Sequence, residues 1–241
     1  TTENSGEIVV VDISNPSNLS IEDQLDLPGT QNARGLFVQG SYLYATSNSS
    51  TRELSIIDIS NPSNISLTGS VNLSGAHLGV HVDGNYAYVV GANNSRELVI
   101  VDVSNPVLPL PLVSFNMTGN NNVWSIGKIG NNIFVGRDNG HFLTIDVSNV
   151  LAPTLTNTVD LGARIRDLEI VPSINYGFVA TDTNGAELQV LDLSVPSAPV
   201  LVGQYNNLNV DFNGVSYQDV DDFVVIAAEG NASELVVISS N

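Results

Sequence analysis

Six near-copies of one short segment constrain the fold of this chain more than any other feature. The clearest copy is Glu97–Pro106, E-L-V-I-V-D-V-S-N-P, an apolar stretch that ends in an aspartate and a proline-containing turn. The corresponding strands are 7–12, 53–58, 97–102, 141–146, 187–192 and 234–239, at spacings of 46, 44, 44, 46 and 47 residues. A period near 45 residues with only short β signals predicts the four-stranded blades of a β-propeller.

Three further segments complete each period. An aromatic strand such as Tyr86–Val90 precedes the motif strand across a polar turn, and a strand of small and apolar residues such as Gly79–Val82 precedes that one. A more polar strand such as Ile65–Leu73 follows the motif. This order predicts an inner strand, a central hairpin and a half-exposed outer strand in every blade.

The strand count predicts the number of blades. The chain holds six motif strands and five of every other kind, 21 in all, and it begins and ends at a motif strand. Five blades need 20 strands, whereas six need 24 and would leave exposed sheet edges. We expect an all-β propeller of five blades, six being the alternative, with four antiparallel strands per blade and a closing blade shared by the N- and C-terminal strands. One motif copy is then surplus, and we expect it to form a fifth edge strand, to displace the other copy or to swap into a neighbouring molecule.

The aspartate that ends the motif strand has a structural explanation. Its carboxylate can accept a hydrogen bond from the backbone N–H two residues on, and the proline that follows stops the ladder because it has no donor. A repeated turn requires one such carboxylate per blade, at the same strand end. We therefore predict turn-forming rather than catalytic roles for Asp12, Asp58, Asp102, Asp146 and Asp192.

These segments resemble the LVIVD-repeat family, whose name is nearly the string at Leu98–Asp102. Further copies are L-S-I-I-D-I-S-N-P at Leu54–Pro62 and L-Q-V-L-D-L-S-V-P at Leu188–Pro196. The resemblance covers the whole chain and implies a β-propeller found mostly in bacterial and archaeal surface or secreted proteins, with no defined activity. It brings no catalytic residues to this chain, and Ser239 replaces the aspartate of the last copy.

Composition narrows the class of partner. The formal net charge of -18 reflects a shortage of cations, because Lys128 and six arginines face 25 acidic residues. An acidic surface repels phosphate groups, so we expect no nucleic-acid binding and no electrostatic membrane docking. No apolar run is long enough to span a bilayer, so we expect no membrane insertion. The partners that fit are a protein or a carbohydrate ligand.

The chain is expected to be a single domain, residues 1–241, because apolar residues are spread evenly along it. The family resemblance implies an extracellular or cell-surface location. The absence of an initiator Met indicates that a leader has been removed or that the chain is part of a longer protein.

The predicted ligand site is the channel rim, formed by unrepeated residues that precede or begin the inner strands, since a propeller usually binds ligands at the mouth of its central channel. Three of the six arginines fall there. With Trp124 they can hold a carboxylate or a sugar; the alternative is that they bond loop carbonyls and offset nearby acids. The predicted rim residues are Asn32, Arg34, His77, Trp124, Arg164, Arg166, Asp211 and Asn213.

No catalytic constellation is recognisable. The sequence has no G-x-S-x-G, no H-E-x-x-H and no phosphate-binding loop, and it holds only three histidines. A glycosidase can work with carboxylates alone. Asp167, Glu169 and Asp211 are the acids near the predicted rim, with Glu169 expected to alternate away from Asp167.

We predict no resident cofactor and no metal, with calcium kept as the alternative. Asp219, Asp221 and Asp222 cluster in one turn, and clustered carboxylates suit calcium. Their spacing lacks the full calcium-loop pattern, so a solvated turn explains them as well.

Three functions are compatible with these observations. The first is a non-catalytic cell-surface or secreted module that binds a protein or a glycan. The second is a hydrolase or lyase that acts at the channel mouth. The third is a structural spacer domain of a larger surface protein.

Overall fold

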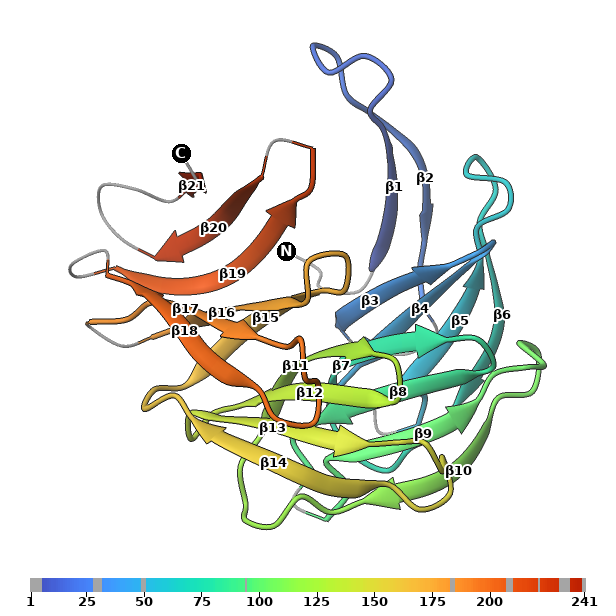
Figure 1. The fold of residues 1–241 in the computed structure, drawn as a ribbon. Coiled ribbons are helices and arrows are strands. Elements are labelled where there is room, and N and C mark those ends of the chain that lie inside the picture. Colours follow the sequence, from blue (N-terminus) through green and yellow to red (C-terminus); the bar gives the residue numbers. More distant parts are fainter. Residues whose placement is uncertain are drawn as a thin grey trace. The chain divides into compact units, whose positions relative to one another are not determined.

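The computed structural model is all-β and describes residues 6–27, 32–48, 51–93, 95–182, 185–206, 210–220, 222–229 and 235–239. Its contacts divide the chain into two compact units, Thr1–Thr118 and Gly119–Asn241, called unit 1 and unit 2 below. Each unit is a row of antiparallel sheets (Figure 1). The single-domain organisation stays a prediction.

Unit 1 begins with a two-stranded sheet and continues with two four-stranded sheets, in each of which the strands neighbour one another in chain order. The two-stranded sheet contains β1 (Ile8–Asp12) and β2 (Ser20–Leu25). The next contains β3 (Ala33–Gln39), β4 (Tyr42–Ser47), β5 (Leu54–Asp58) and β6 (Ser66–Val71). The last contains β7 (His77–Asp83), β8 (Tyr86–Gly91), β9 (Leu98–Asp102) and β10 (Leu110–Phe115).

Unit 2 holds two four-stranded sheets and ends with a three-stranded one. The first contains β11 (Val123–Ile129), β12 (Asn132–Arg137), β13 (His141–Asp146) and β14 (Thr154–Asp160). The second contains β15 (Ile165–Val171), β16 (Tyr176–Thr181), β17 (Leu188–Asp192) and β18 (Val200–Tyr205). The third contains β19 (Asp211–Gln218), β20 (Phe223–Glu229) and β21 (Leu235–Ser239).

The predicted blade pattern is confirmed. Five sheets begin with the expected inner strand, and in each of them the motif strand stands third. Four of these blades have four strands and the fifth has three, and β1–β2 supplies a motif strand with its outer strand. Helices are absent from the described residues. The favoured fold class, an all-β propeller with five blades, is therefore the observed one.

The core consists of apolar layers between adjacent sheets. In unit 1, Leu54 and Ile56 of β5 pack in one buried cluster with Val80 of β7. The motif strands β5 and β9 are buried along both faces, which explains why they read as continuous apolar runs. The terminal copies differ, because β1 and β21 alternate between more and less exposed residues. The two ends of the repeat array therefore lack the cover that the other copies have.

The motif aspartates form the predicted turns. Each carboxylate accepts a hydrogen bond of 2.7 to 2.9 Å from the backbone N–H of the serine two residues on, at Asp12, Asp58, Asp102, Asp146 and Asp192. The bonds from that serine lower the pKa of four of these carboxyls. The backbone N–H has the larger effect at Asp12 and Asp192, and the hydroxyl at Asp58 and Asp102.

The glutamate that opens most motif copies has a role that the sequence analysis missed. Glu97 is fully buried, and its Oε2 accepts a hydrogen bond of 3.1 Å from the N–H of Met117, twenty residues on. Glu53 accepts in the same way from Leu73 at 2.7 Å. In the sequence, a large apolar residue stands at a constant interval of twenty residues after each of these glutamates, and this interval could have indicated the contact. This glutamate ties the start of the motif strand to the chain that leaves the outer strand.

Candidate functional site

Every inner strand carries a β-bulge at the aligned position within the predicted rim. The pairing register shifts between Ala33 and Leu36, His77 and Gly79, Val123 and Ser125, Ile165 and Asp167, and Phe212 and Gly214. The bulged positions include Arg34, Leu78, Trp124, Arg166 and Asn213. A bulge leaves a residue out of the ladder and re-aims its side chain, and bulges are enriched beside binding sites. We call these five residues the bulge column.

In unit 1 the predicted rim residues differ in exposure. Asn32 and Arg34 are exposed, and the Asn32 N–H donates a 3.2 Å hydrogen bond to Asn48 Oδ1. His77 is fully buried, with its Nδ1 2.8 Å from the Gly75 carbonyl oxygen. Burial lowers the pKa of His77, which favours the neutral ring with Nδ1–H as the donor. The His77 side chain therefore faces protein rather than solvent.

In unit 2 the bulge column runs across three neighbouring strands. The inner strand β15 contacts β11 on one side and β19 on the other. Trp124, Arg166 and Asn213 therefore stand at matching positions on adjacent strands. The Asn213 amide donates a 3.2 Å hydrogen bond to Glu229 Oε2 on the neighbouring strand.

Two predicted rim arginines converge on one carboxylate. Asp182 Oδ2 lies 3.5 Å from Arg164 Nε and 3.2 Å from a terminal nitrogen of Arg166. Their partner is thus the acid that follows β16, which the sequence had not placed at the rim. Because two guanidinium groups share one carboxylate, this cluster of three side chains has an excess of one positive charge.

Two N–H donors of the bulge column have no partner in the described structure. Trp124 Nε1 and Arg166 Nε are both shielded from solvent and make no hydrogen bond there. Indole and guanidinium groups only donate hydrogen bonds, so an acceptor must satisfy them. Buried donors without partners are rare in folded proteins and indicate a place for water or a ligand.

Asp167 holds two inner strands together. Its Oδ2 accepts a 3.1 Å hydrogen bond from the N–H of Val215 in β19, and its Oδ1 accepts one of 2.9 Å from Leu168 N–H. Burial raises the pKa of Asp167. Since both oxygens are engaged by the backbone, this carboxylate has a structural role.

We expected the side chain of Glu169 to point to the opposite face of the strand from Asp167, and this expectation was wrong. Residues two apart on a strand share a face, so Glu169 lies on the same side as Asp167. Burial raises the pKa of Glu169, and the charge of Asp167 raises it further. Asp211, the third acid, is the first residue of β19.

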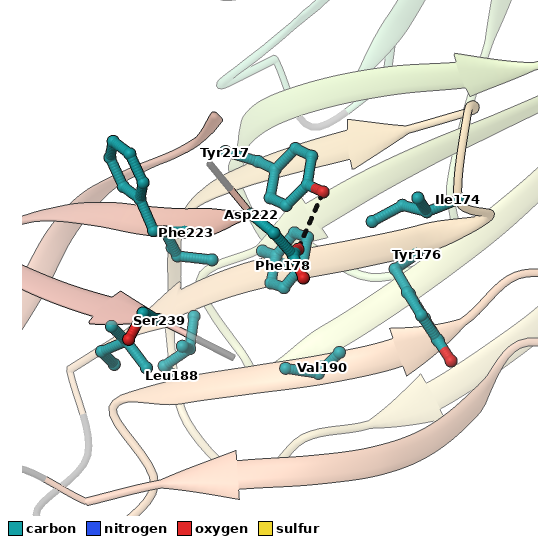
Figure 2. Close-up of a pocket in the computed structure, with 11 residues that line it drawn as sticks. Ile174, Tyr176, Phe178, Leu188, Val190, Tyr217, Asp222, Phe223 and Ser239 are labelled. Carbon is teal, nitrogen blue, oxygen red and sulfur yellow. Dashed lines mark hydrogen bonds between the residues drawn. The ribbon is translucent and has the colours of Figure 1, made fainter. Parts of the chain in front are cut away.

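A cavity of about 390 Å³ lies in unit 2 between the second and third sheets. Phe178 stacks on Tyr217 with ring centroids 5.3 Å apart, and the Tyr217 hydroxyl donates a 3.0 Å hydrogen bond to Asp222 Oδ1 (Figure 2). Apart from this pair, the walls are mostly aliphatic and aromatic. The cavity is lined by Ile174, Tyr176, Phe178, Leu188, Val190, Tyr217, Asp222, Phe223, Val224, Ile238 and Ser239. No feature of the sequence had indicated it.

The calcium alternative stays a prediction. Asp219 is exposed in the turn between β19 and β20, Asp222 accepts from Tyr217, and Asp221 lies outside the described residues. Within the described ranges, no three His, Asp or Glu side chains are grouped closely enough to hold a metal ion. The same ranges contain no helix that could cross a membrane.

Comparison with known proteins gives one family and many structural neighbours. The family model described as the LVIVD repeat matches residues 3–26, 31–73, 74–116, 121–161 and 169–207. No curated protein matches the sequence.

The solved structures share the fold at low identity. A protein from Lactobacillus plantarum superimposes with a TM-score of 0.77 at 13% identity, over 96% of this chain and 76% of that one. A putative 6-phosphogluconolactonase from Bacteroides uniformis gives 0.76 at 14%, over 93% and 71%. The β-propeller domain of Myceliophteria thermophila Cps50 (Swd1) gives 0.69 at 14%, over 92% and 77%. At such identities the likeness concerns the fold alone.

Proposed function

Because the chain belongs to the LVIVD-repeat family, we propose that it is a non-catalytic binding module, secreted or at the cell surface, for a protein or glycan ligand. One observation carries the proposal. Trp124 Nε1 and Arg166 Nε are unpaired donors on neighbouring bulges of β11 and β15. A site with donors and no acceptor among them selects a ligand that brings the acceptor.

The charge balance favours a carboxylate as that acceptor. Arg164 and Arg166 share the single carboxylate of Asp182, so the remaining positive charge attracts one further negative group beside them. The Trp124 ring adds an apolar surface of the kind that sugar rings and aliphatic side chains pack on. The net charge of -18 repels polyanions at long range, so a ligand with an isolated carboxylate suits the site best. A mildly acidic glycan or an acidic protein side chain has this chemistry.

A catalytic role has less support. Asp167, the acid beside the bulge column, uses both oxygens to bond backbone N–H groups. The likeness to a putative lactonase is at 14% identity and carries no chemistry to this chain. The hydrolase or lyase and the spacer domain are therefore alternative outcomes of the test.

The test is a glycan and cell-envelope binding screen, followed by calorimetric titration of the hits. Trp124→Phe removes the indole N–H and keeps an aromatic ring, and we expect it to weaken affinity about five- to tenfold. Arg166→Ala should weaken it further, whereas the exposed Arg96→Ala in unit 1 serves as control.

Two results would overturn the proposal. A blank screen with turnover of a model ester or glycoside would favour the hydrolase. A blank screen without turnover would favour the spacer.

A further inference from the structure

The hairpin between the first and second strands of a blade is longer in the last two blades. Two residues separate these strands in the sheets that begin with β3, β7 and β11, as at Gly84–Asn85. Four residues separate them in the last two sheets, 172–175 after β15 and 219–222 after β19. Each longer loop contributes a residue to the cavity of unit 2, Ile174 from the first and Asp222 from the second. The cavity is therefore built in part from segments that the other blades lack.

Tyr217, which also lines the cavity, is a second departure from the repeat. The residues aligned with it in the other inner strands are Val38, Val82, Lys128 and Ile170. Its ring stacks on Phe178 at an interplanar angle of 8°, and its hydroxyl is directed at Asp222 (Figure 2). The stacking and the hydrogen bond together hold one aromatic pair and one carboxylate side by side at the cavity.

Asp222 brings a charge to a place that is neutral in the other hairpins. The corresponding residues, directly before the second strand, are Ser41, Asn85, Asn131 and Asn175. Asp222 has a left-handed backbone with φ 52°, and Asn175 has the same conformation with φ 57°. Partial burial raises the pKa of Tyr217, and the hydrogen bond to Asp222 raises it further, so the phenol stays a neutral donor and the negative charge stays on Asp222.

The walls of the cavity combine aromatic faces with a single kind of charge. Its volume of about 390 Å³ falls in the range of small-molecule sites. Among the described residues that line it, Asp222 is the only charged one, and the aromatic ones are Tyr176, Phe178, Tyr217 and Phe223. The face of an aromatic ring attracts cations, and a carboxylate attracts them more strongly. Both components of the walls therefore favour positive charge.

We propose that this cavity binds a small organic cation, an ammonium group carried on an aromatic or aliphatic body. The ammonium group lies beside Asp222 and the stacked rings, and the body packs against Leu188, Val190 and Ile238. The net charge of -18 raises the concentration of cations around the protein. A metal ion suits these mostly apolar walls less, because ions such as calcium take about six to eight oxygen ligands. The site is separate from the bulge column, whose donors select an acceptor.

The test compares two ligands of the same shape. Phenyltrimethylammonium is a cation, and tert-butylbenzene is its uncharged counterpart. Ligand-detected NMR titration at matched concentrations, within the solubility of the neutral compound, gives both affinities. We expect the cation to bind at least about fivefold more tightly.

Asp222→Asn removes the charge and suits the left-handed backbone, since Asn175 occupies the equivalent place. It should weaken binding of the cation about fivefold and leave the neutral compound unchanged. Asp219→Asn is the matched control, because it removes the same charge from an exposed position in the same turn that does not line the cavity. Trp124→Phe should leave binding of the cation unchanged, which distinguishes this site from the bulge column.

A filled cavity gives a second comparison. Val190→Phe places a larger side chain among the lining residues and should abolish binding of both compounds, with folding checked by circular dichroism. If this variant does not fold, the comparison of Asp222→Asn with Asp219→Asn decides alone. Equal affinities for the two compounds, no binding of either, or equal losses in the two aspartate variants would each overturn the proposal.

Discussion

Asp167 and Val215 join the inner strands of two neighbouring blades, since Asp167 Oδ2 accepts a 3.1 Å hydrogen bond from the Val215 N–H. The residues aligned with Asp167 in the other inner strands are Gly35, Gly79, Ser125 and Gly214, so this carboxylate belongs to one blade only. The bond fixes β15 against β19 one residue beyond the bulges. It therefore sets the position of Arg166 relative to Asn213.

Replacing Asp167 tests this link. Asp167→Ala leaves the Val215 N–H without its acceptor, and we expect a loss of about 1–3 kcal/mol in the free energy of unfolding. Urea unfolding followed by circular dichroism measures it. Asp219→Ala, in an exposed turn, is the control and should change the midpoint little. Equal midpoints for both variants would contradict the link.

The buried glutamates should behave in the same way. Glu97→Ala removes the acceptor of the Met117 N–H in a buried place, so we expect a destabilisation of about 1–3 kcal/mol. Glu97→Gln keeps an oxygen that can accept, and should lose less. Urea titration of the two variants separates the hydrogen bond from the filled volume. A larger loss in the Gln variant than in the Ala variant would rule out this role.

Acid should weaken the turns. The lowered pKa values of Asp12, Asp58, Asp102 and Asp192 mean that the folded state favours their charged form, so their contribution is present above the ordinary value of 3.8 and is lost as pH falls through the lowered values. Asp167 and Glu169 act in the opposite sense. Because burial raises their pKa values, their contribution is full at low pH and is lost as pH rises through the raised values.

Asp102→Asn isolates the turn effect. An asparagine accepts the same bond without titrating, as Asn105 does from the Val107 N–H at 3.2 Å. The variant should unfold somewhat more easily than the parent near neutral pH, because it lacks the charged acceptor, and the two urea midpoints should converge as the pH falls below 3.8. Urea midpoints measured across the acid range would show this. Parallel curves for variant and parent would exclude the turn as a source of acid sensitivity.

Leu193, the residue directly after the motif aspartate of β17, packs in one buried cluster with Phe134 and Phe142 of the preceding sheet. Leu193→Ala empties a completely buried position, and we expect a cost of about 2–5 kcal/mol. Leu201→Ala, on the partly exposed outer strand β18, is a volume-matched control with a smaller expected cost. Thermal unfolding of the two proteins measures the difference. Similar melting temperatures would mean that Leu193 is not needed for packing between the two sheets.

The parts of the fold that could be predicted from the sequence are those that repeat along the chain. Six aligned copies located the motif strands to within one residue, and they identified the turn aspartates because these recur at the same place in every copy but the last. The same alignment placed Trp124, Arg166 and Asn213 in one column. It did not reveal that the column is a bulge, because a bulge is a shift in pairing register against the partner strand, which the sequence of one strand does not show.

The features that were missed depend on contacts between distant segments. Asp182 follows β16, and its pairing with Arg164 and Arg166 depends on how the β15–β16 hairpin folds back. The cavity is lined by residues of two neighbouring sheets, such as Phe178 of β16 and Val224 of β20. No single-strand pattern encodes either feature.

Trp124 is the only tryptophan in the chain, so its fluorescence reports on the proposed site alone. The most direct test titrates the protein with galacturonate oligomers or a carboxylate-bearing hit from the screen, with the neutral galactose oligomer as control. We expect a saturable change in Trp124 emission that Arg166→Ala abolishes and the neutral ligand does not produce. Binding by calorimetry with no change in emission, and with Arg166→Ala binding as well as the parent, would contradict it.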